Sequence, residues 1–286
     1  MRLGIFAKTF ARPQLEEVFD AVKEHYFECV QFNLACSGLP TLPDEITPSL
    51  ITRIHEAAIT RGIEIAAVSG TYNMIHPDRE MRQAGLRRLR ILASTCHDIG
   101  TSIITLCTGS RDPENMWHWH PENASSQAWS DLLSSMEAAL LIAEEEQVTL
   151  AFEPERANVV NTAARGHALL MAMQSPSLKV VIDPANLIIP GDEGQMRQVL
   201  NEAFDLIGED IVIAHAKDRS MYDTFQAAGE GILNFNQYVH LLHAVAFNGP
   251  LILHGLSEGQ VDAARQFLFV KLHTPLEEQI SAMKGS

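Results

Sequence analysis

Short runs of apolar and β-branched residues alternate with longer amphipathic segments along the whole chain. Eight of these runs are too short for a buried helix and are bounded by Gly, Pro, Asn or Asp, which is typical of buried strands. The predicted strands cover residues 2–6, 29–33, 63–70, 102–109, 148–154, 179–186, 211–218 and 250–256.

The segments between these runs have helical periodicity. In residues 14–26, Leu15, Val18, Phe19 and Val22 fall at positions i, i+3, i+4 and i+7, which places them on one face of a helix. The same pattern predicts helices at 47–61, 78–98, 125–146, 162–174, 193–207, 234–247 and 257–272.

Eight strands that alternate with eight helices indicate parallel strands joined by right-handed crossovers. In a chain of 286 residues this pattern predicts a (β/α)₈ TIM barrel, with residues 1–286 forming a single domain. An open doubly wound sheet would require a Gly-rich phosphate turn after the first strand. The sequence there, "GIFAKTFARP", contains no such turn.

Four consecutive predicted strands end in polar side chains that are able to bind a metal. They are Glu153, Asp183, His215 and His254, from the fifth to the eighth strand. The carboxyl ends of barrel strands meet at one mouth, so these groups are expected to converge there. A lone Asp or His at a strand end is as well explained by a structural hydrogen bond. Four at a similar depth favour a shared site, and two carboxylates with two imidazoles suit Mn²⁺, Co²⁺ or Zn²⁺ better than Ca²⁺.

Four motifs at these strand ends carry a family resemblance. They are "FEPE" at 152–155, "IDPAN" at 182–186, "AHAKD" at 214–218 and the "GEGILNF" loop at 229–235. Over essentially its whole length the chain resembles the sugar-phosphate isomerase/epimerase family of xylose-isomerase-like TIM barrels. The resemblance implies one divalent metal ion (Mn²⁺, Co²⁺, Zn²⁺ or Mg²⁺), held by Glu153, Asp183, His215 and a fourth position that is normally glutamate. In this chain the fourth position is His254.

The resemblance also implies a chemistry. Members of the family abstract a proton next to a carbonyl and stabilise an enediolate with the metal, and Glu153 would be the acid/base. Their second catalytic glutamate corresponds to His254. A metal-bound imidazole nitrogen cannot also accept a proton, so His254 is a candidate for either the catalytic or the ligand role. One-base isomerisation and two-base epimerisation both stay open, as does a shift in metal preference toward zinc.

Five further residues are candidates for substrate contact: His76, Glu155, Asn186, Lys217 and Arg111. Asn186 stands where many epimerases of the family have histidine, and Gln31 stands where a glutamate is common. Lys217 could hold an oxyanion or pair with a nearby glutamate. His76 could instead cap a helix, Glu155 could pair with a neighbouring loop, and Arg111 could be solvent-exposed. Trp117 and Trp119 would form an aromatic lid or a contact between two protomers.

Composition narrows the class of partner. A net charge of −15 argues against a nucleic-acid-binding face, and no stretch reaches the roughly 18 apolar residues that span a bilayer. The N-terminus has no signal-peptide pattern, and the four cysteines form no CxxC pair, which indicates reduced thiols and a cytoplasmic protein. The expected partner is therefore a small carbohydrate substrate, with no nucleic acid and no membrane, and the protein could be a homo-oligomer.

Three other functions compete with an isomerase or epimerase of a sugar, sugar phosphate or small hydroxy-keto compound. An inosose-dehydratase-like lyase would share the enediolate but expel water. A non-catalytic sugar or metal binder would explain the missing second glutamate. An abasic-site nuclease of the endonuclease IV type would need three zinc ions, many more ligands and a basic face, which the charge of −15 disfavours.

Overall fold

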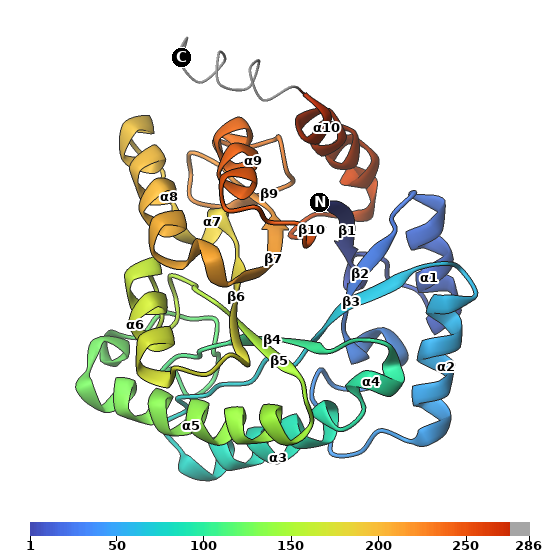
Figure 1. Cartoon of the computed structure of the whole chain (residues 1–286), viewed down its shortest axis with the longest axis vertical. Coiled ribbons are helices and arrows are strands. Elements are labelled where there is room, and N and C mark those ends of the chain that lie inside the picture. Colours follow the sequence, from blue (N-terminus) through green and yellow to red (C-terminus); the bar gives the residue numbers. More distant parts are fainter. Residues whose placement is uncertain (275–286) are drawn as a thin grey trace.

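Eight parallel strands close into a barrel in this computed structural model, which describes residues 1–274 (Figure 1). Residues 275–286 of the expected domain lie outside the described residues. Around the barrel the order is β1-β10-β7-β6-β5-β4-β3-β2. The predicted TIM barrel is confirmed. Its strands are β1 (Arg2–Phe6), β2 (Cys29–Phe32), β3 (Glu64–Ser69), β4 (Ile103–Cys107), β5 (Thr149–Glu153), β6 (Leu178–Ile182), β7 (Ile211–Ala216) and β10 (Pro250–Leu253).

Helices surround this barrel and cover its outer face (Figure 1). They are α1 (Leu15–Glu24), α2 (Pro48–Ile59), α3 (Arg79–Ala93), α4 (Cys96–Ile99), α5 (Ser126–Glu145), α6 (Ala163–Met173), α7 (Pro184–Leu187), α8 (Glu193–Ile207), α9 (Phe235–Ala244) and α10 (Val261–His273). Short 3₁₀ helices lie at Ala7–Thr9, Leu34–Ser37, Pro121–Ala124, Gly208–Asp210 and Glu258–Gln260. A two-stranded hairpin, β8 (Asp218–Arg219) with β9 (Phe225–Gln226), follows β7.

Two predicted elements differ from those in the structure. The run predicted as a strand at 179–186 ends at Ile182, because Asp183 begins the short helix α7. The Asp183 side chain accepts a hydrogen bond from the Ala185 backbone N–H at 3.0 Å, and Pro184 occupies the first helical position. The helix predicted at 78–98 divides into α3 and α4.

The barrel interior explains why the strand ends are polar. Six buried apolar residues from six strands pack together inside the barrel: Cys29, Ala67, Ala151, Val181, Ile213 and Ile252. Strand side chains alternate between faces, so the residue two positions later points to the same side. In these strands that residue is, in the same order, Gln31, Ser69, Glu153, Asp183, His215 and His254. The apolar layer thus supports a polar layer at the mouth.

The loop after β9 wraps around a buried carboxylate. The Asp218 side chain accepts hydrogen bonds from the backbone N–H groups of Gly229, Gly231 and Leu233 at 3.1, 2.9 and 2.9 Å. A Cβ at Gly231 would lie 2.3 Å from Asp218 Oδ1, so the close approach requires glycine. The "HAKD" and "GEG" motifs are therefore joined structurally, and Asp218 fixes the chain that follows the His215 strand.

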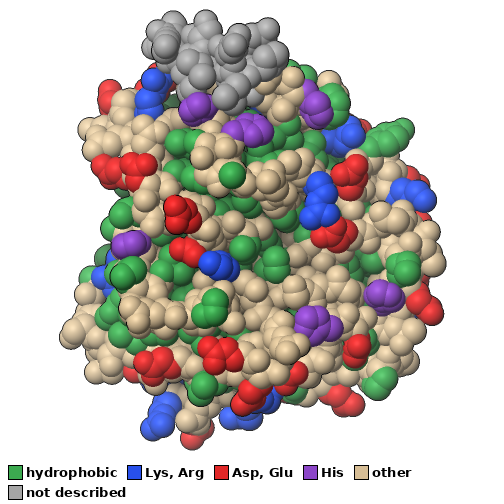
Figure 2. All heavy atoms as spheres, viewed as in Figure 1, with side chains coloured by type: hydrophobic (Ala, Val, Ile, Leu, Met, Phe, Trp, Pro, Cys, Tyr) green, Lys and Arg blue, Asp and Glu red, His purple; other side chains and the backbone are tan. Residues whose placement is uncertain are grey.

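Charged side chains of both signs are scattered over the face seen in Figure 2. Within residues 1–274, no helix has the length and apolar character needed to cross a membrane. All four cysteines carry free thiols, and three of them are buried.

Candidate active site

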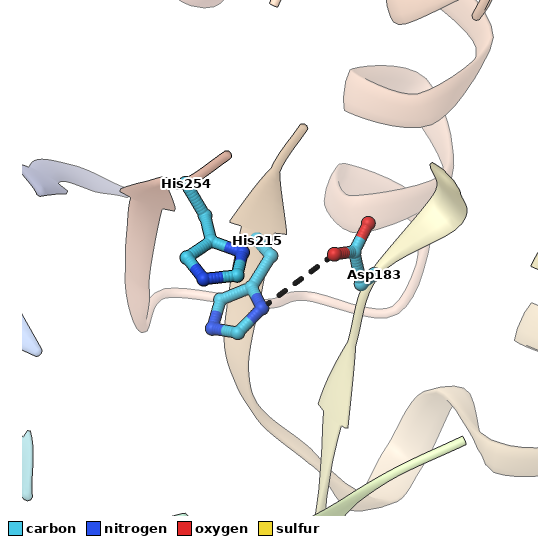
Figure 3. Close-up of side chains that lie close together, drawn as sticks. All are labelled: Asp183, His215 and His254. Carbon is cyan, nitrogen blue, oxygen red and sulfur yellow. Dashed lines mark ion pairs between the residues drawn. The ribbon is translucent and has the colours of Figure 1, made fainter. Parts of the chain in front are cut away.

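Four side chains from consecutive barrel strands meet at the mouth, as predicted. His215 Nδ1 lies 3.5 Å from Glu153 Oε1 and 3.7 Å from Asp183 Oδ2. The His254 ring packs beside the His215 ring, with 5.0 Å between centroids, and its other neighbour is Phe6 at 4.9 Å. Figure 3 shows the two imidazoles side by side and facing Asp183, so a small ion could contact all three groups.

The donor atoms at this point fit a divalent cation. One ligand atom from each of Asp183, His215 and His254 lies within 4.8 Å of the others. His215 Nδ1 and His254 Nδ1 are buried and have no hydrogen-bond partner within the described chain, and the buried Asp183 Oδ2 has the Lys217 ammonium 2.8 Å away as its ion-pair partner. Because an unsatisfied buried polar atom is costly, two unpartnered imidazole nitrogens beside a buried carboxylate indicate a ligand there. A carboxylate with two imidazoles is a donor set that suits Zn²⁺, Co²⁺, Mn²⁺ or Fe²⁺.

The electrostatics of these groups are set by one another. Burial alone would lower the pKa of His215, but the charges of Glu153 and Asp183 outweigh it and raise that pKa to about 9. Burial, followed by the charges of Lys217 and His215, holds the pKa of His254 well below its usual range. His254 is therefore neutral, with a free nitrogen lone pair.

A chain of hydrogen bonds orients Glu153. Lys217 Nζ lies 2.8 Å from Asp183 Oδ2 as an ion pair and donates to Asn186 Oδ1 at 3.0 Å. This contact turns the Asn186 amide so that its Nδ2 donates to Glu153 Oε1 at 2.6 Å. Lys217 is buried, and the pKa of its ammonium is raised because Asp183 and Glu153 outweigh the effect of burial. The sequence allows Lys217 either an oxyanion contact or an ion pair with a glutamate. In the structure Lys217 pairs instead with Asp183.

A cavity of about 500 Å³ opens in front of these groups. Glu153, Glu155, Asn186, Lys217 and His254 line it, together with His215. Trp117 and Phe225 form aromatic walls, and the Lys217 ammonium lies 4.0 Å from the Phe225 ring centroid. Gln31, Asn33, Thr41, Ser69, Thr71 and Thr105 form a neutral polar wall. The volume is sufficient for a small-molecule ligand, and the lining offers it several polar contacts.

A larger cavity of about 800 Å³ lies elsewhere, lined by α6, α8 and the segments that precede β6 and β7. It lies near the amino-terminal ends of these strands. Barrel active sites lie at the carboxyl ends, where the candidate ligands converge, so the smaller cavity is the candidate active site.

Two of the predicted substrate contacts lie outside this cavity. Arg111 is buried, pairs with Asp131 at 2.6 Å and donates to the Ile75 carbonyl at 3.0 Å. His76 accepts a hydrogen bond from the Asp78 backbone N–H at 3.0 Å, next to the first turn of α3. Both side chains bond to neighbouring loop segments and do not line the cavity, so we leave them out of the substrate site.

Glu155 is the cavity carboxylate with the most unusual surroundings. Burial and the charge of Glu153 raise its pKa from 4.5 to about 7. A raised carboxyl pKa contributes stability below pH 4.5 that is lost as pH rises through about 7. In metal-free protein, we expect the fall in the free energy of unfolding over this pH range to be about 3 kcal/mol smaller in Glu155→Gln than in the wild type. Urea unfolding at pH 4.5 and pH 8 measures it.

The exposed Glu45→Gln serves as the control for that measurement, because it removes an exposed carboxylate that does not line the cavity. It should keep the wild-type pH dependence. Identical pH dependence in the wild type and Glu155→Gln would mean that Glu155 ionises as an exposed glutamate does.

The model of the xylose isomerase-like TIM barrel family matches residues 19–272. The chain belongs to this family. Solved structures with the same fold include an L-ribulose 3-epimerase (17% identity, TM-score 0.76), of which 97% is covered by 99% of this chain. The probable 3-DHS dehydratase AsbF from Bacillus anthracis shares 12% identity (TM-score 0.75; 96% of this chain, 100% of that chain). IOLI with a bound zinc atom shares 13% (TM-score 0.72; 95% and 98%). No curated protein sequence matches.

Sequence reasoning missed the neutral polar wall opposite the carboxylates. In the sequence Gln31 stands out only as a departure from the family, and Ser69 and Thr105 do not stand out. The signal was present in the alternation: Gln31 and Ser69 each follow a buried interior residue by two positions, and Thr105 follows the partly buried Ile103 in the same way. The place of Phe225 in the cavity wall could not be predicted, because β9 is a two-residue strand without a strong strand pattern in the sequence.

Proposed function

We propose that this protein is a divalent-metal-dependent isomerase or epimerase of a sugar, sugar phosphate or small hydroxy-keto compound. The observation that carries the proposal is the convergence of two buried, unpartnered imidazole nitrogens and the buried Asp183 carboxylate beside Glu153, at a polar cavity in the barrel mouth. Structural relatives named as sugar epimerases support the substrate class.

In this proposal Asp183, His215 and His254 hold the ion, and Glu153 lies close enough to join them. When bound, a divalent cation polarises a substrate carbonyl as a Lewis acid. Glu153 removes the proton from the neighbouring carbon and returns it. The hydrogen bond from Asn186 fixes one carboxylate oxygen of Glu153, so the other is free to face the substrate. Lys217 maintains that orientation.

His254 acts as a ligand and not as a base. Its Nδ1 has no hydrogen-bond partner in the described chain, and its low pKa makes it a poor proton carrier. Glu153 is then the carboxylate beside the ion that is left to carry a proton. This favours isomerisation, in which one group moves a proton between adjacent carbons while the hydroxyl proton moves to the former carbonyl oxygen. Epimerisation would require a second group on the opposite face of the substrate.

Metal analysis and deuterium exchange test this proposal. We expect one equivalent of divalent metal per chain. The test substrates are aldoses and ketoses, both free and phosphorylated. We also expect Co²⁺- or Mn²⁺-loaded protein to catalyse exchange of deuterium from D₂O into the carbon next to their carbonyl group. Removing the metal with EDTA should stop the exchange, and adding it back should restore the exchange.

Three outcomes would contradict the proposal. Absence of a bound metal would remove its basis. Polyol binding by metal-loaded protein without any exchange would make the protein a binder. Conversion of an inosose to a product that has lost one water would make it a lyase of the dehydratase kind.

A further inference from the structure

Among residues 1–274, Gln31 makes the side-chain hydrogen bond to His215 that lies away from the proposed ion. It is buried at the end of β2, and its Oε1 lies 2.8 Å from His215 Nε2. Its Nε2 donates to Ser69 Oγ at 3.3 Å and to Thr105 Oγ1 at 3.2 Å. These bonds link β2, β3 and β4 to β7 across the barrel interior, since β10 and β1 separate β7 from β2 in the barrel wall.

The chemistry of the amide determines which ring nitrogen carries a proton. An amide oxygen only accepts, so His215 Nε2 must donate an N–H to it. The two hydroxyl groups hold the NH₂ end of Gln31 and keep the oxygen turned toward the imidazole. His215 Nδ1, which faces Asp183 and Glu153 and has no hydrogen-bond partner in the described chain, is then left as the nitrogen for the ion.

We propose that Gln31 is the positioning residue of the metal centre. It fixes the Nε2–H tautomer and the ring orientation of His215, so that Nδ1 is presented as the ligand atom. Ser69 and Thr105 hold Gln31 in place. This inference rests on the proposed function, because it assumes that an ion binds between Asp183, His215 and His254.

Gln31 is a neutral hydrogen-bond partner of His215, so it affects the charge of the metal site differently from a carboxylate. Metal-binding histidines commonly donate their second N–H to a carboxylate, a carbonyl or water, and loss of that partner typically costs about 10- to 100-fold in metal affinity. Gln31 supplies the hydrogen bond without adding a negative charge. His254, where the family has glutamate, also leaves the centre less negative, so the net charge of the site depends on both substitutions.

The decisive measurement uses the wild-type protein. In Zn²⁺-loaded, ¹⁵N-histidine-labelled protein, His215 should show a metal-bound Nδ1 and a protonated Nε2 by long-range ¹H–¹⁵N NMR. The signal is assigned by its loss in His215→Gln. A protonated Nδ1, or Zn²⁺ on Nε2, would overturn the proposal, because Gln31 would then face the wrong nitrogen.

Substitution provides the second test. Gln31→Met keeps the size of the side chain but removes the acceptor, and we expect Co²⁺ affinity to fall by about 10- to 100-fold. Gln31→Glu restores an acceptor and should bind Co²⁺ at least as tightly as the wild type. Gln127→Met makes the same chemical change on the exposed start of α5 and should leave affinity unchanged.

These results separate this inference from the proposed function. If wild-type protein binds no Co²⁺, the proposed metal centre fails and the inference fails with it. If wild-type and Gln31→Met proteins bind Co²⁺ equally, only the role of Gln31 fails. Thermal unfolding verifies that each variant is folded, and the NMR result on the wild type decides the question even if Gln31→Met does not fold.

Discussion

Glu153→Gln is expected to lower turnover by about 10²- to 10⁴-fold, the usual contribution of a positioned acid/base. The substitution keeps an oxygen that can accept the 2.6 Å hydrogen bond from Asn186, so the side chain should stay in place. It removes the group that would carry the proton. The measurement is kcat for the isomerisation, together with the rate of deuterium exchange from D₂O on the same metal-loaded protein.

The control for this prediction is Glu155→Gln. It removes a carboxylate that lines the same cavity and lies two residues after Glu153. Glu153→Gln should unfold at the wild-type temperature and should reduce exchange far more than Glu155→Gln does. Turnover within a few-fold of the wild type in Glu153→Gln would reject Glu153 as the base. A larger loss in Glu155→Gln would transfer the role to Glu155.

The fold was predictable because its signals are local. Each strand is a short apolar run bounded by turn residues, and each helix has its own apolar stripe, so the order of elements already specified a barrel. The strand ends were predictable for the same reason: Glu153, Asp183, His215 and His254 each follow a buried run. The sequence could also predict that they meet, because parallel barrel strands end at one mouth.

Which side chains pair with one another was harder to predict from the sequence, because it depends on distances across the barrel. From the sequence, Lys217 could have contacted substrate or paired with either glutamate. In the structure it pairs with Asp183, which directly follows the neighbouring strand β6. The position of Arg111 after a strand favours a phosphate ligand, yet the side chain pairs with Asp131 on α5 and does not line the cavity. These contacts depend on partners that are distant in the sequence, and the sequence alone does not identify those partners.

His254→Ala is expected to weaken metal binding by more than the 10- to 100-fold typical of losing an outer partner, because it removes a ligand itself. His254 Nδ1 has no competing hydrogen bond in the described chain, so the imidazole is available to the ion. His254→Glu should keep a ligand at this position and retain tight binding. Competition between Co²⁺ and a chromophoric chelator measures both variants against the wild type.

The pair of variants separates the two roles that the sequence left open for His254. If it is a ligand, His254→Ala loses metal and activity together, and saturating Co²⁺ restores part of the activity. If it is a base, His254→Ala binds Co²⁺ with wild-type affinity but does not turn over, which would contradict our assignment. In His254→Glu a second carboxylate stands beside the ion, so this variant should gain exchange on the opposite face of the substrate. An unchanged stereochemical outcome would mean that the position binds metal without reaching the reacting carbon.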